Sequence, residues 1–447
     1  MVKFAVPAPK IFKPFQSVPT PSNPFQDPRE GGIPSAADCG SAARINPIQP
    51  LQAKKQTKSR PKNESAIGPI CHCRARISGY NDERLWRKTS LTKYRMTAAL
   101  SNFAARLGQE ASWLNNVHEF NELALELFAL QFTHNPAYRK ICEARRLTPD
   151  KVEHWTQVPF VPTAAFKELE LSSIPPQERT AVFHSSGTTE QIPSRHFHST
   201  ESMKVYESAC WTWFNRNVLA LGEKYDLLVL TPPSAQVPHS SLVHMFEMVR
   251  QGTDASQSAF VGKPDMSGAW VLDFEATLAS LNNPSKPKLI LGTAFSFVHL
   301  LDYLAEKSLR FQLPYGSRIM ETGGYKNRSR SLPKARLHFL LTELLGVPRE
   351  NIICEYGMSE LSSQAYDTDP ERRFRFPDWA RVQIISPETG REVANGEKGL
   401  IRIFDLANVF SVAAIQTEDL GVRRGNGFEL VGRAALAEAR GCSLMTA

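Results

Sequence analysis

The sequence predicts an α/β protein with a smaller β-rich subdomain near its end. From about residue 150 to residue 378, short apolar runs alternate with longer segments of helical pattern, which is typical of a sheet covered by helices. After residue 378 the pattern changes to strand-like runs separated by turns, of which Glu388-Thr389-Gly390 is one. We therefore expect a disordered extension over 1–95, an α/β core over 96–378, and a β-rich subdomain with a short tail over 379–447.

Residues 1–95 differ in composition from the rest of the 447-residue chain. They carry 17 Lys and Arg residues against 6 Asp and Glu residues, and they hold 12 of the 31 prolines. A basic, proline-rich segment with few periodic apolar positions is typical of disorder. Either Met96 is the biological start and the upstream part is not native coding sequence, or the extension is a real basic tail or an organelle-targeting segment. Asp82, Glu83 and the prolines fit targeting poorly, which favours the first interpretation.

Charge and cysteine content exclude several classes of protein. Residues 96–447 carry 36 basic and 39 acidic side chains, so this part does not predict binding to nucleic acid or to an anionic membrane. No window approaches the roughly 20 apolar residues that span a bilayer, and no secretory signal is recognisable at the N-terminus. Seven widely spaced cysteines do not indicate a disulfide framework. We expect a cytoplasmic protein without an integral membrane segment.

Individual elements follow from the spacing of apolar residues. Between Trp113 and about Leu147 these residues recur at helical spacing and predict a helical layer. Short buried strands are predicted over 226–230, 288–291 and 317–320, and helices over 297–307 and 332–345. Gly346 and Pro348 end the last of these helices. In the β-rich subdomain we predict strands over 382–385, 400–404 and 428–431.

A loop of small and hydroxylated residues follows the apolar segment Ala181-Val182-Phe183. It reads His184, Ser185, Ser186, Gly187, Thr188 and Thr189. Small residues let backbone N–H groups close around a phosphate, and hydroxyls add donors to its oxygens. Taken alone the pattern is weak, because Ser, Gly and Thr are common in structural turns.

A second motif follows the apolar run Asn351-Ile352-Ile353-Cys354. It reads Tyr356, Gly357, Met358, Ser359 and Glu360. The glycine turns the chain where a strand ends, which leaves the Glu360 carboxylate free to hold a hard cation such as Mg²⁺ between phosphate oxygens. In this order, the two motifs together indicate a protein that uses ATP.

Four further features accompany these motifs. They are Gly323-Gly324 followed by Lys326, Thr417 with Asp419, Gly432-Arg433, and the segment from His239 to Phe246, which includes His244. Gly323 and Gly324 follow a predicted strand and allow a flat ligand to lie against the backbone. Asp419, which follows the first strands of the β-rich subdomain, supplies a carboxylate for ribose hydroxyls.

Taken together, these residues resemble the adenylate-forming superfamily, which contains acyl-CoA synthetases, phenylacetate–CoA ligases and the adenylation domains of peptide synthetases. The matched signatures are the phosphate loop (Ser185 to Thr189), the Tyr-Gly-x-Ser/Thr-Glu motif (Tyr356 to Glu360), the ribose motif (Thr417 and Asp419) and the Gly-Arg hinge (Gly432-Arg433). Segments 321–326, 355–364 and 440–443 look most similar to the acyl-protein synthetases of bacterial bioluminescence operons. The resemblance covers roughly residues 100–447 and implies the adenylate-forming α/β fold.

The match departs from the superfamily at three places. Glu190 stands where the loop often has a further glycine, so we expect it to point away or to pair with a cation such as Arg195. Glu418 replaces the glycine of the ribose motif, which weakens that match without removing Asp419. The sequence ends 14 residues after Arg433, so we expect the usual C-terminal domain with its catalytic lysine to be lacking. This favours the acyl-protein synthetase branch over an ordinary CoA ligase.

The resemblance implies ATP-dependent activation of a fatty or related carboxylic acid to an acyl adenylate, with Mg²⁺ held by Glu360. The implied nucleotide contacts are Ser185, Ser186, Gly187, Thr188, Thr189, Gly323, Gly324, Tyr356, Gly357, Ser359, Asp419 and Arg433. It also implies that Cys442 accepts the acyl group as a thioester, for delivery to an acyl reductase partner. Lys326 is a candidate for the missing lysine, and His244 for contact with the acid's carboxylate end. A surface lysine and a core histidine are the competing structural interpretations.

Two alternative functions stay open. One is a stand-alone ligase that transfers the acyl group to CoA or to a carrier protein. The other is an inactive scaffold, for which Glu190 and Glu418 are the evidence, although Thr188 and Glu360 argue against it. Cys354 lies in an apolar run, so we expect it to be buried rather than reactive.

Overall fold

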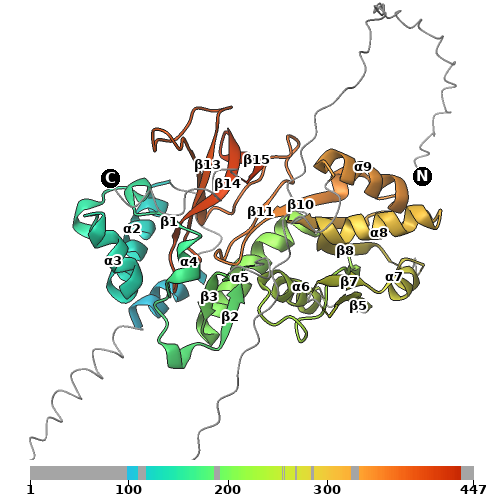
Figure 1. Ribbon diagram of the computed structural model, residues 1–447, viewed down its shortest axis with the longest axis horizontal. Helices are drawn as coiled ribbons and strands as arrows, with labels where there is room; N and C mark the ends of the chain where they lie inside the picture. The colour runs from blue at the N-terminus through green and yellow to red at the C-terminus, as the bar shows by residue number, and fades with distance from the viewer. Residues whose placement is uncertain are drawn as a thin grey trace, which may run out of the picture. The chain divides into compact units, whose positions relative to one another are not determined.

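The computed structural model describes residues 98–108, 117–185, 192–253, 255, 257–266, 269–282, 286–323 and 332–433 (Figure 1). The chain divides into two units, Met1–Gly79 and Tyr80–Ala447, and all of the described residues lie in the second. The predicted extension over 1–95 therefore lies outside the described residues, as do Met96 and the tail after Arg433.

The centre of the α/β part is a six-stranded sheet with the strand order β11-β10-β9-β8-β4-β5. Its strands are β4 (Asp226–Val229), β5 (Ser258–Phe260), β8 (Lys288–Thr293), β9 (Arg318–Thr322), β10 (Ile352–Tyr356) and β11 (Ala365–Tyr366). β11 pairs antiparallel with β10, and the other five strands are parallel to their neighbours. The three strands predicted over 226–230, 288–291 and 317–320 are confirmed as β4, β8 and β9.

Helices cover both faces of this sheet, because successive strand residues point to opposite sides. Leu227 and Val229 pack with α5 (Thr200–Val218) and α6 (Ser241–Gly252). Leu228 and Leu230 pack in the core formed with α7 (Phe274–Leu281), α8 (Ala294–Glu306) and α9 (Lys334–Leu345). Figure 1 shows α8 and α9 side by side. The helices predicted over 297–307 and 332–345 are confirmed, although α8 begins three residues earlier, where Thr293 caps it.

The chain reverses its direction of strand addition at β4. From β4 it passes through α6 to β5 at one edge, and it then returns to β8 on the other side of β4. β9 and β10 follow outward from β8. In sheets of this kind ligands bind beyond the carboxyl ends of the strands. The motifs that follow β9 and β10 therefore lie at the edge where a ligand site is expected.

The β-rich subdomain is a five-stranded sheet, ordered β1-β14-β13-β12 with β15 also paired to β14. Its strands are β1 (Val161–Pro162), β12 (Ala380–Ile385), β13 (Lys398–Asp405), β14 (Ala414–Arg424) and β15 (Gly427–Arg433). The three predicted strands are confirmed as β12, β13 and β15. β14 was not predicted, and Thr417 and Asp419 lie within it rather than after a strand. Pairing with β13 and β15 outweighs the low strand propensity of its polar residues.

A helical layer packs on the β-rich sheet. It contains α2 (Val117–His134), α3 (Pro136–Ala144) and a helix over 98–108. The helical pattern predicted from 113 to 147 is interrupted at Asn135, whose Oδ1 accepts the Tyr138 backbone N–H at 3.1 Å and caps α3. Phe120 meets Phe404 of β13 edge to face at 5.9 Å, and both belong to the largest core cluster.

The remaining elements are short. They are α4 (Ala165–Glu168), β2 (Ala181–His184), β3 (Arg195–His198), β6 (Gly262–Pro264), β7 (Trp270–Leu272), and the 3₁₀ turns Pro149–Lys151, Trp155–Gln157, Pro176–Glu178 and Arg349–Asn351. β2 and β3 form one antiparallel hairpin, and β6 and β7 form another. In the part of the chain that the structure describes, no helix has the length and apolar character needed to cross a membrane.

Candidate active site

The β2–β3 hairpin carries the predicted phosphate loop (residues 185–189). His184 pairs with Arg195 at the end of the ladder. Beyond this pair, the Ser185 N–H donates to the Ser194 carbonyl at 3.3 Å, and the Ser194 N–H donates to the Ser185 hydroxyl at 3.0 Å. Ser186, Gly187, Thr188, Thr189 and Glu190 lie outside the described residues. The structure therefore defines the base of the loop.

The second motif forms a turn after β10, here called the Glu360 turn (residues 357–363). Glycine at position 357 leaves room for the buried Glu355 carboxylate, because an added Cβ would lie 2.3 Å from Oε1 of Glu355. Glu360 is buried, and the Ser359 hydroxyl donates to its carboxylate at 3.0 Å. The hydroxyl thus orients one oxygen of the Glu360 carboxylate.

Two contacts join the hairpin to the Glu360 turn. Nδ1 of His196, on β3, lies 2.8 Å from the Ser359 carbonyl oxygen, and the Ser194 and Ser359 hydroxyls lie 3.4 Å apart. Burial lowers the pKa of His196 to about 4, so the imidazole is neutral near pH 7 and its Nδ1–H donates to the carbonyl. The structure therefore brings Ser185 and Glu360 into one site through Ser194 and His196, neither of which was predicted.

The residues at the end of β9 lie beside the end of β10 and form another part of the candidate site. Gly323 has a φ of +74°, a left-handed conformation that favours glycine. The Thr322 hydroxyl before it donates to the Glu355 carboxylate on β10. Burial raises the pKa of Glu355 to about 7. Gly324 and Lys326 lie outside the described residues, so Lys326's role stays a prediction.

Tyr356, Asp419 and Arg433 meet across the two sheets. The Tyr356 hydroxyl donates to Oδ2 of Asp419 at 2.9 Å. Asp419 on β14 pairs with Arg433 on β15, whose Nε lies 3.8 Å from the other carboxylate oxygen. Burial raises the pKa of Asp419, and the Tyr356 hydrogen bond acts in the opposite direction. Glu418 precedes Asp419 on β14, where the pairing with β13 is irregular, and its charge also raises the pKa of Asp419.

His244 lies on α6 behind β2. Its Nε2 is 2.9 Å from Oε1 of Glu207 on α5, and its ring lies 5.4 Å from the Phe183 ring. Nearby, His239 stacks on His184 at 4.6 Å and its Nδ1 donates to the Val182 carbonyl at 3.1 Å. His244 thus packs against the strand that leads into the phosphate loop. Its proposed contact with the acyl group stays a prediction.

The structure also shows the surroundings of Arg195 and Cys354. Arg195, considered as a partner for Glu190, lies 3.8 Å from Oε1 of Glu170. Cys354 is buried as predicted, and burial raises its pKa well above the usual range, so it is a poor nucleophile. Cys442 lies outside the described residues.

Among the described residues, no group of three His, Cys, Asp or Glu side chains is arranged to hold a metal ion by itself. Mg²⁺ in nucleotide enzymes is commonly held by one or two carboxylates together with the substrate phosphates. Glu360, buried beside Ser359 at the base of the phosphate loop, fits such a site.

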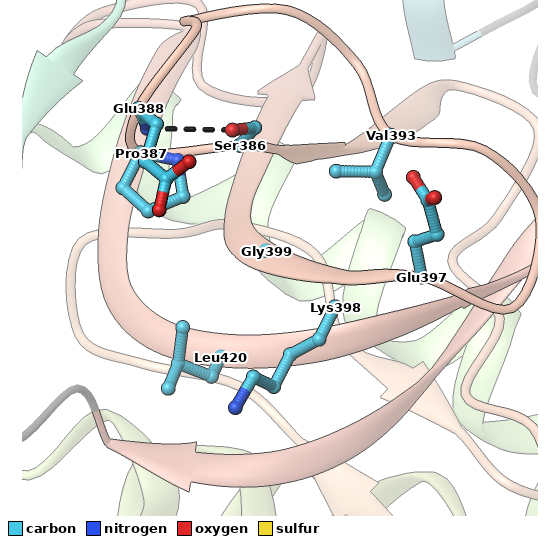
Figure 2. Close-up of a pocket in the computed structure, with 8 residues that line it drawn as sticks. All are labelled: Ser386, Pro387, Glu388, Val393, Glu397, Lys398, Gly399 and Leu420. Atoms are coloured by element: carbon cyan, nitrogen blue, oxygen red, sulfur yellow. Dashed lines mark hydrogen bonds between the residues drawn. The ribbon is translucent and has the colours of Figure 1, made fainter.

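A separate hollow of about 310 Å³ lies in the β-rich subdomain (Figure 2). Its lining is Ser386, Pro387, Glu388, Val393, Glu397, Lys398, Gly399 and Leu420. Figure 2 shows these residues gathered around the β12–β13 connection, β13 and β14, and none of them is a predicted site residue. The candidate active site consists instead of the β2–β3 hairpin, the Glu360 turn, the end of β9 and the contacts of Asp419.

The chain was compared with known proteins. Two relatives are named long-chain-fatty-acid–luciferin-component ligase. The one from Aliivibrio fischeri is 25% identical over 76% of this chain and 90% of its own length. The one from Vibrio harveyi is 24% identical over 71% of this chain and 84% of its own.

Solved structures of 2-hydroxyisobutyryl-CoA ligase are similar in fold. The complex with 2-HIB-AMP and CoA in the thioesterification state has a TM-score of 0.56 and 15% identity, over 72% of this chain and 69% of that one. An open conformation has a TM-score of 0.53 and 14% identity, over 74% and 69%. These likenesses confirm the predicted adenylate-forming α/β fold.

A family model decides the assignment. The model described as acyl-protein synthetase, LuxE, matches residues 110–447, which is well over half of the chain. The match covers every described motif, from the β2–β3 hairpin to Arg433. The chain belongs to the LuxE family of acyl-protein synthetases.

Proposed function

We propose that this protein activates a long-chain fatty acid with ATP and transfers the acyl group to its own Cys442. The observation that carries the proposal is the joining of the phosphate-loop hairpin to the Glu360 turn by His196 and Ser194, in a chain of this family. The two relatives named as long-chain-fatty-acid ligases support the choice of acid.

In the first step a carboxylate oxygen of the acid attacks the α-phosphorus of ATP. The bond from that phosphorus to the bridging oxygen breaks, and pyrophosphate leaves with the electron pair. The products are acyl-AMP and pyrophosphate. Negative charge gathers on the phosphate oxygens in the transition state, so donors fixed in advance lower the barrier.

The described residues divide these tasks among them. The Ser185 hydroxyl, which can still donate its hydrogen, and the loop through Thr189 would bind the outer phosphates. Asp419, held by Tyr356, would accept hydrogen bonds from the ribose hydroxyls. The backbone at Gly323 and Gly324 would lie against the purine. Glu360 would hold Mg²⁺, which when bound neutralises phosphate charge.

In the second step the thiolate of Cys442 attacks the acyl carbonyl. The bond from that carbon to the phosphate oxygen of the adenylate breaks, so AMP leaves and an acyl thioester remains on the protein. The thiol proton is released before attack. We propose that an acyl reductase then takes the acyl group. Cys142, Cys210 and Cys354 are buried free thiols, which supports both the choice of Cys442 and a reducing, cytoplasmic location.

A labelling experiment tests the proposal. The protein is incubated with radiolabelled long-chain fatty acid, ATP and Mg²⁺, with and without CoA, and separated on a denaturing gel. ATP-dependent label on the protein that neutral hydroxylamine removes supports acyl transfer to a cysteine. Label found only on CoA would instead indicate a stand-alone ligase, and absence of any ATP-dependent label would indicate an inactive scaffold.

A further inference from the structure

The Glu360 turn rests on a buried polar loop of the β-rich subdomain, residues 405–413. Asp405, at the end of β13, is fully buried. Its Oδ2 accepts the backbone N–H groups of Ser362 and Ser363 at 3.0 and 2.9 Å. Its Oδ1 accepts the Ser363 hydroxyl at 2.7 Å and the Ala407 N–H at 3.0 Å. One carboxylate thus fixes two consecutive residues of the turn.

Asn408 holds the other part of the same turn. Its Nδ2 donates to the backbone carbonyl of Glu360 at 2.8 Å and to that of Val412 at 3.1 Å. Its Oδ1 accepts the Ser362 hydroxyl at 2.6 Å. Asn408 therefore contacts the backbone of the residue whose carboxylate would hold the cation.

The 405–413 loop is itself anchored by the helical layer. Nε2 of Gln131 on α2 donates to the Asn408 carbonyl at 2.7 Å, and Oε1 of Gln131 accepts the Ala413 N–H at 3.0 Å. Gln131 thus reaches Asn408 itself, whereas Nδ2 of Asn135 donates to the Ser411 carbonyl farther along the loop, at 3.3 Å. Because Gln131 of α2 holds the 405–413 loop in place, the hydrogen bonds of Asp405 and Asn408 can fix the position of the Glu360 turn.

Burying a carboxylate in the protein interior costs free energy, because the charged form loses its hydration. Burial raises the pKa of Asp405 to about 6, against the effect of its hydrogen bonds, which records the cost of desolvating the charge. No described ion pair includes Asp405 among its partners. An apolar side chain of similar volume would avoid this cost but would leave the N–H groups of Ser362, Ser363 and Ala407 without their acceptor. The four hydrogen bonds of Asp405 point to a need for defined geometry.

We infer that Asp405 and Asn408 are positioning residues, which hold the Glu360 turn so that the carboxylate of Glu360 has the orientation that Mg²⁺ binding requires. The inference rests on the proposed function. His196 fixes the Ser359 carbonyl from the hairpin side, and Asn408 fixes the Glu360 carbonyl from the β-rich side. The catalytic carboxylate is thus clamped between two parts of the fold.

The test compares two identical substitutions. Asn408→Asp removes the donor to the Glu360 carbonyl but keeps the acceptor for Ser362. Asn135→Asp removes the donor to the Ser411 carbonyl of the same loop and keeps the cap of α3. Both side chains are buried. Each variant is assayed for ATP–pyrophosphate exchange over a range of Mg²⁺ concentrations, and its thermal midpoint is measured.

We expect Asn408→Asp to raise the half-saturating Mg²⁺ concentration by about tenfold and to lower kcat, whereas Asn135→Asp lowers only the thermal midpoint. If Asn408→Asp does not fold, a second pair of variants with smaller changes is used for the same test. Ser362→Ala removes the hydroxyl bound to Asn408, and Ser411→Ala removes a buried hydroxyl that donates to the Leu171 carbonyl at 2.9 Å. Ser362→Ala should shift the Mg²⁺ dependence in the same direction, and Ser411→Ala should leave it unchanged.

Equal Mg²⁺ dependence in each test variant and its control would overturn the inference. Glu360→Gln separates this outcome from failure of the proposed function. If Glu360→Gln abolishes exchange while Asn408→Asp and Ser362→Ala behave like their controls, the positioning role is wrong and the function stands. If Glu360→Gln leaves the Mg²⁺ dependence unchanged, the proposed role of Glu360 fails, and the inference fails with it.

Discussion

The hydroxyl of Tyr356 donates to Asp419 at 2.9 Å and so links the end of β10 to β14. The two strands belong to different sheets. The Tyr356 ring packs against Phe374, Phe376 and Phe428, which fixes the position of its hydroxyl. One residue of the Tyr-Gly-x-Ser/Thr-Glu motif therefore orients the carboxylate of the ribose motif.

Removing this hydroxyl should weaken ATP binding. We expect Tyr356→Phe to raise the KM for ATP about fivefold with a change in kcat below about twofold, because the loss of one hydrogen bond leaves Asp419 less well oriented. Tyr366→Phe is the control, since the buried Tyr366 hydroxyl has no hydrogen-bond partner among the described residues. Pyrophosphate exchange at varied ATP measures both variants. An unchanged KM for ATP in Tyr356→Phe would show that the orientation of Asp419 by Tyr356 does not contribute to nucleotide binding.

Neutralising Glu360 should stop adenylation. In Glu360→Gln we expect exchange to fall by about two orders of magnitude or more, because the amide is a poor ligand for Mg²⁺. Glu306→Gln, an exposed change on α8, should exchange normally. Circular dichroism and thermal melting establish that both variants fold. Normal exchange in folded Glu360→Gln would remove this residue from the site.

Substitution of Cys442 should stop acyl transfer to the protein without stopping adenylate formation. Cys442→Ser keeps everything that adenylate formation requires, so pyrophosphate exchange should persist while hydroxylamine-sensitive labelling disappears. Cys210→Ser is the control, because that thiol is buried and burial raises its pKa well above the usual range. Thioester labelling of Cys442→Ser at the parent level would identify another cysteine as the acceptor.

Residues 1–95 should be dispensable. They contain none of the matched motifs, and the family match begins at residue 110. We expect a protein that begins at Met96 to be produced in folded form and to exchange pyrophosphate at the rate of the full chain. A large loss of folded yield or of activity would show that the extension contributes to the fold or to the site.

Glu355 should make stability depend on pH. Burial raises its pKa from 4.5 to about 7, so the folded protein holds this proton more tightly than the unfolded chain does. Its contribution to stability therefore falls as pH rises between these two values, and Glu355→Gln lacks this loss. Relative to the parent, Glu355→Gln should gain thermal stability between about pH 5 and about pH 8, by on the order of 3 kcal/mol at most.

Melting curves across this pH range measure the difference for Glu355→Gln. Glu343→Gln, on the partly exposed side of α9, should show no comparable trend. A difference between Glu355→Gln and the parent that is constant or shrinks with rising pH would contradict the assignment.

Local pattern was enough to predict much of the fold. β4 and β8 contain the continuous apolar runs 227–229 and 289–291, and β9 contains the apolar pair Ile319-Met320; short runs of this kind indicate buried parallel strands. β14 escaped prediction because its polar residues 416–419 depend on pairing with β13 and β15, which a local pattern does not reveal. The break between α2 and α3 was signalled by Asn135-Pro136, a capping residue followed by proline at the first helical position.

The candidate site was predicted unevenly for the same reason. Glu360 and Asp419 stand in recognisable motifs. His196 and Asn408 contact the Glu360 turn from 163 and 48 positions away, and neither stands in a motif. The pattern Arg195-His196-Phe197-His198 was the only local signal, since it places two imidazoles on one face of β3. Contacts of this kind are properties of tertiary structure.

The anchoring of the 405–413 loop by α2 has a consequence for biosynthesis. Gln131 and Asn408 are 277 positions apart, and β1 pairs with β14 over a similar separation. While the chain emerges from the ribosome, α2 and β1 must wait for their partners until nearly all of it has been made. Until then Phe120 lacks its contact with Phe404 of β13, and the part of the core that the β-rich sheet covers stays exposed. Chains truncated before β14 should therefore aggregate or be degraded, and recombinant yield should depend on chaperone supply.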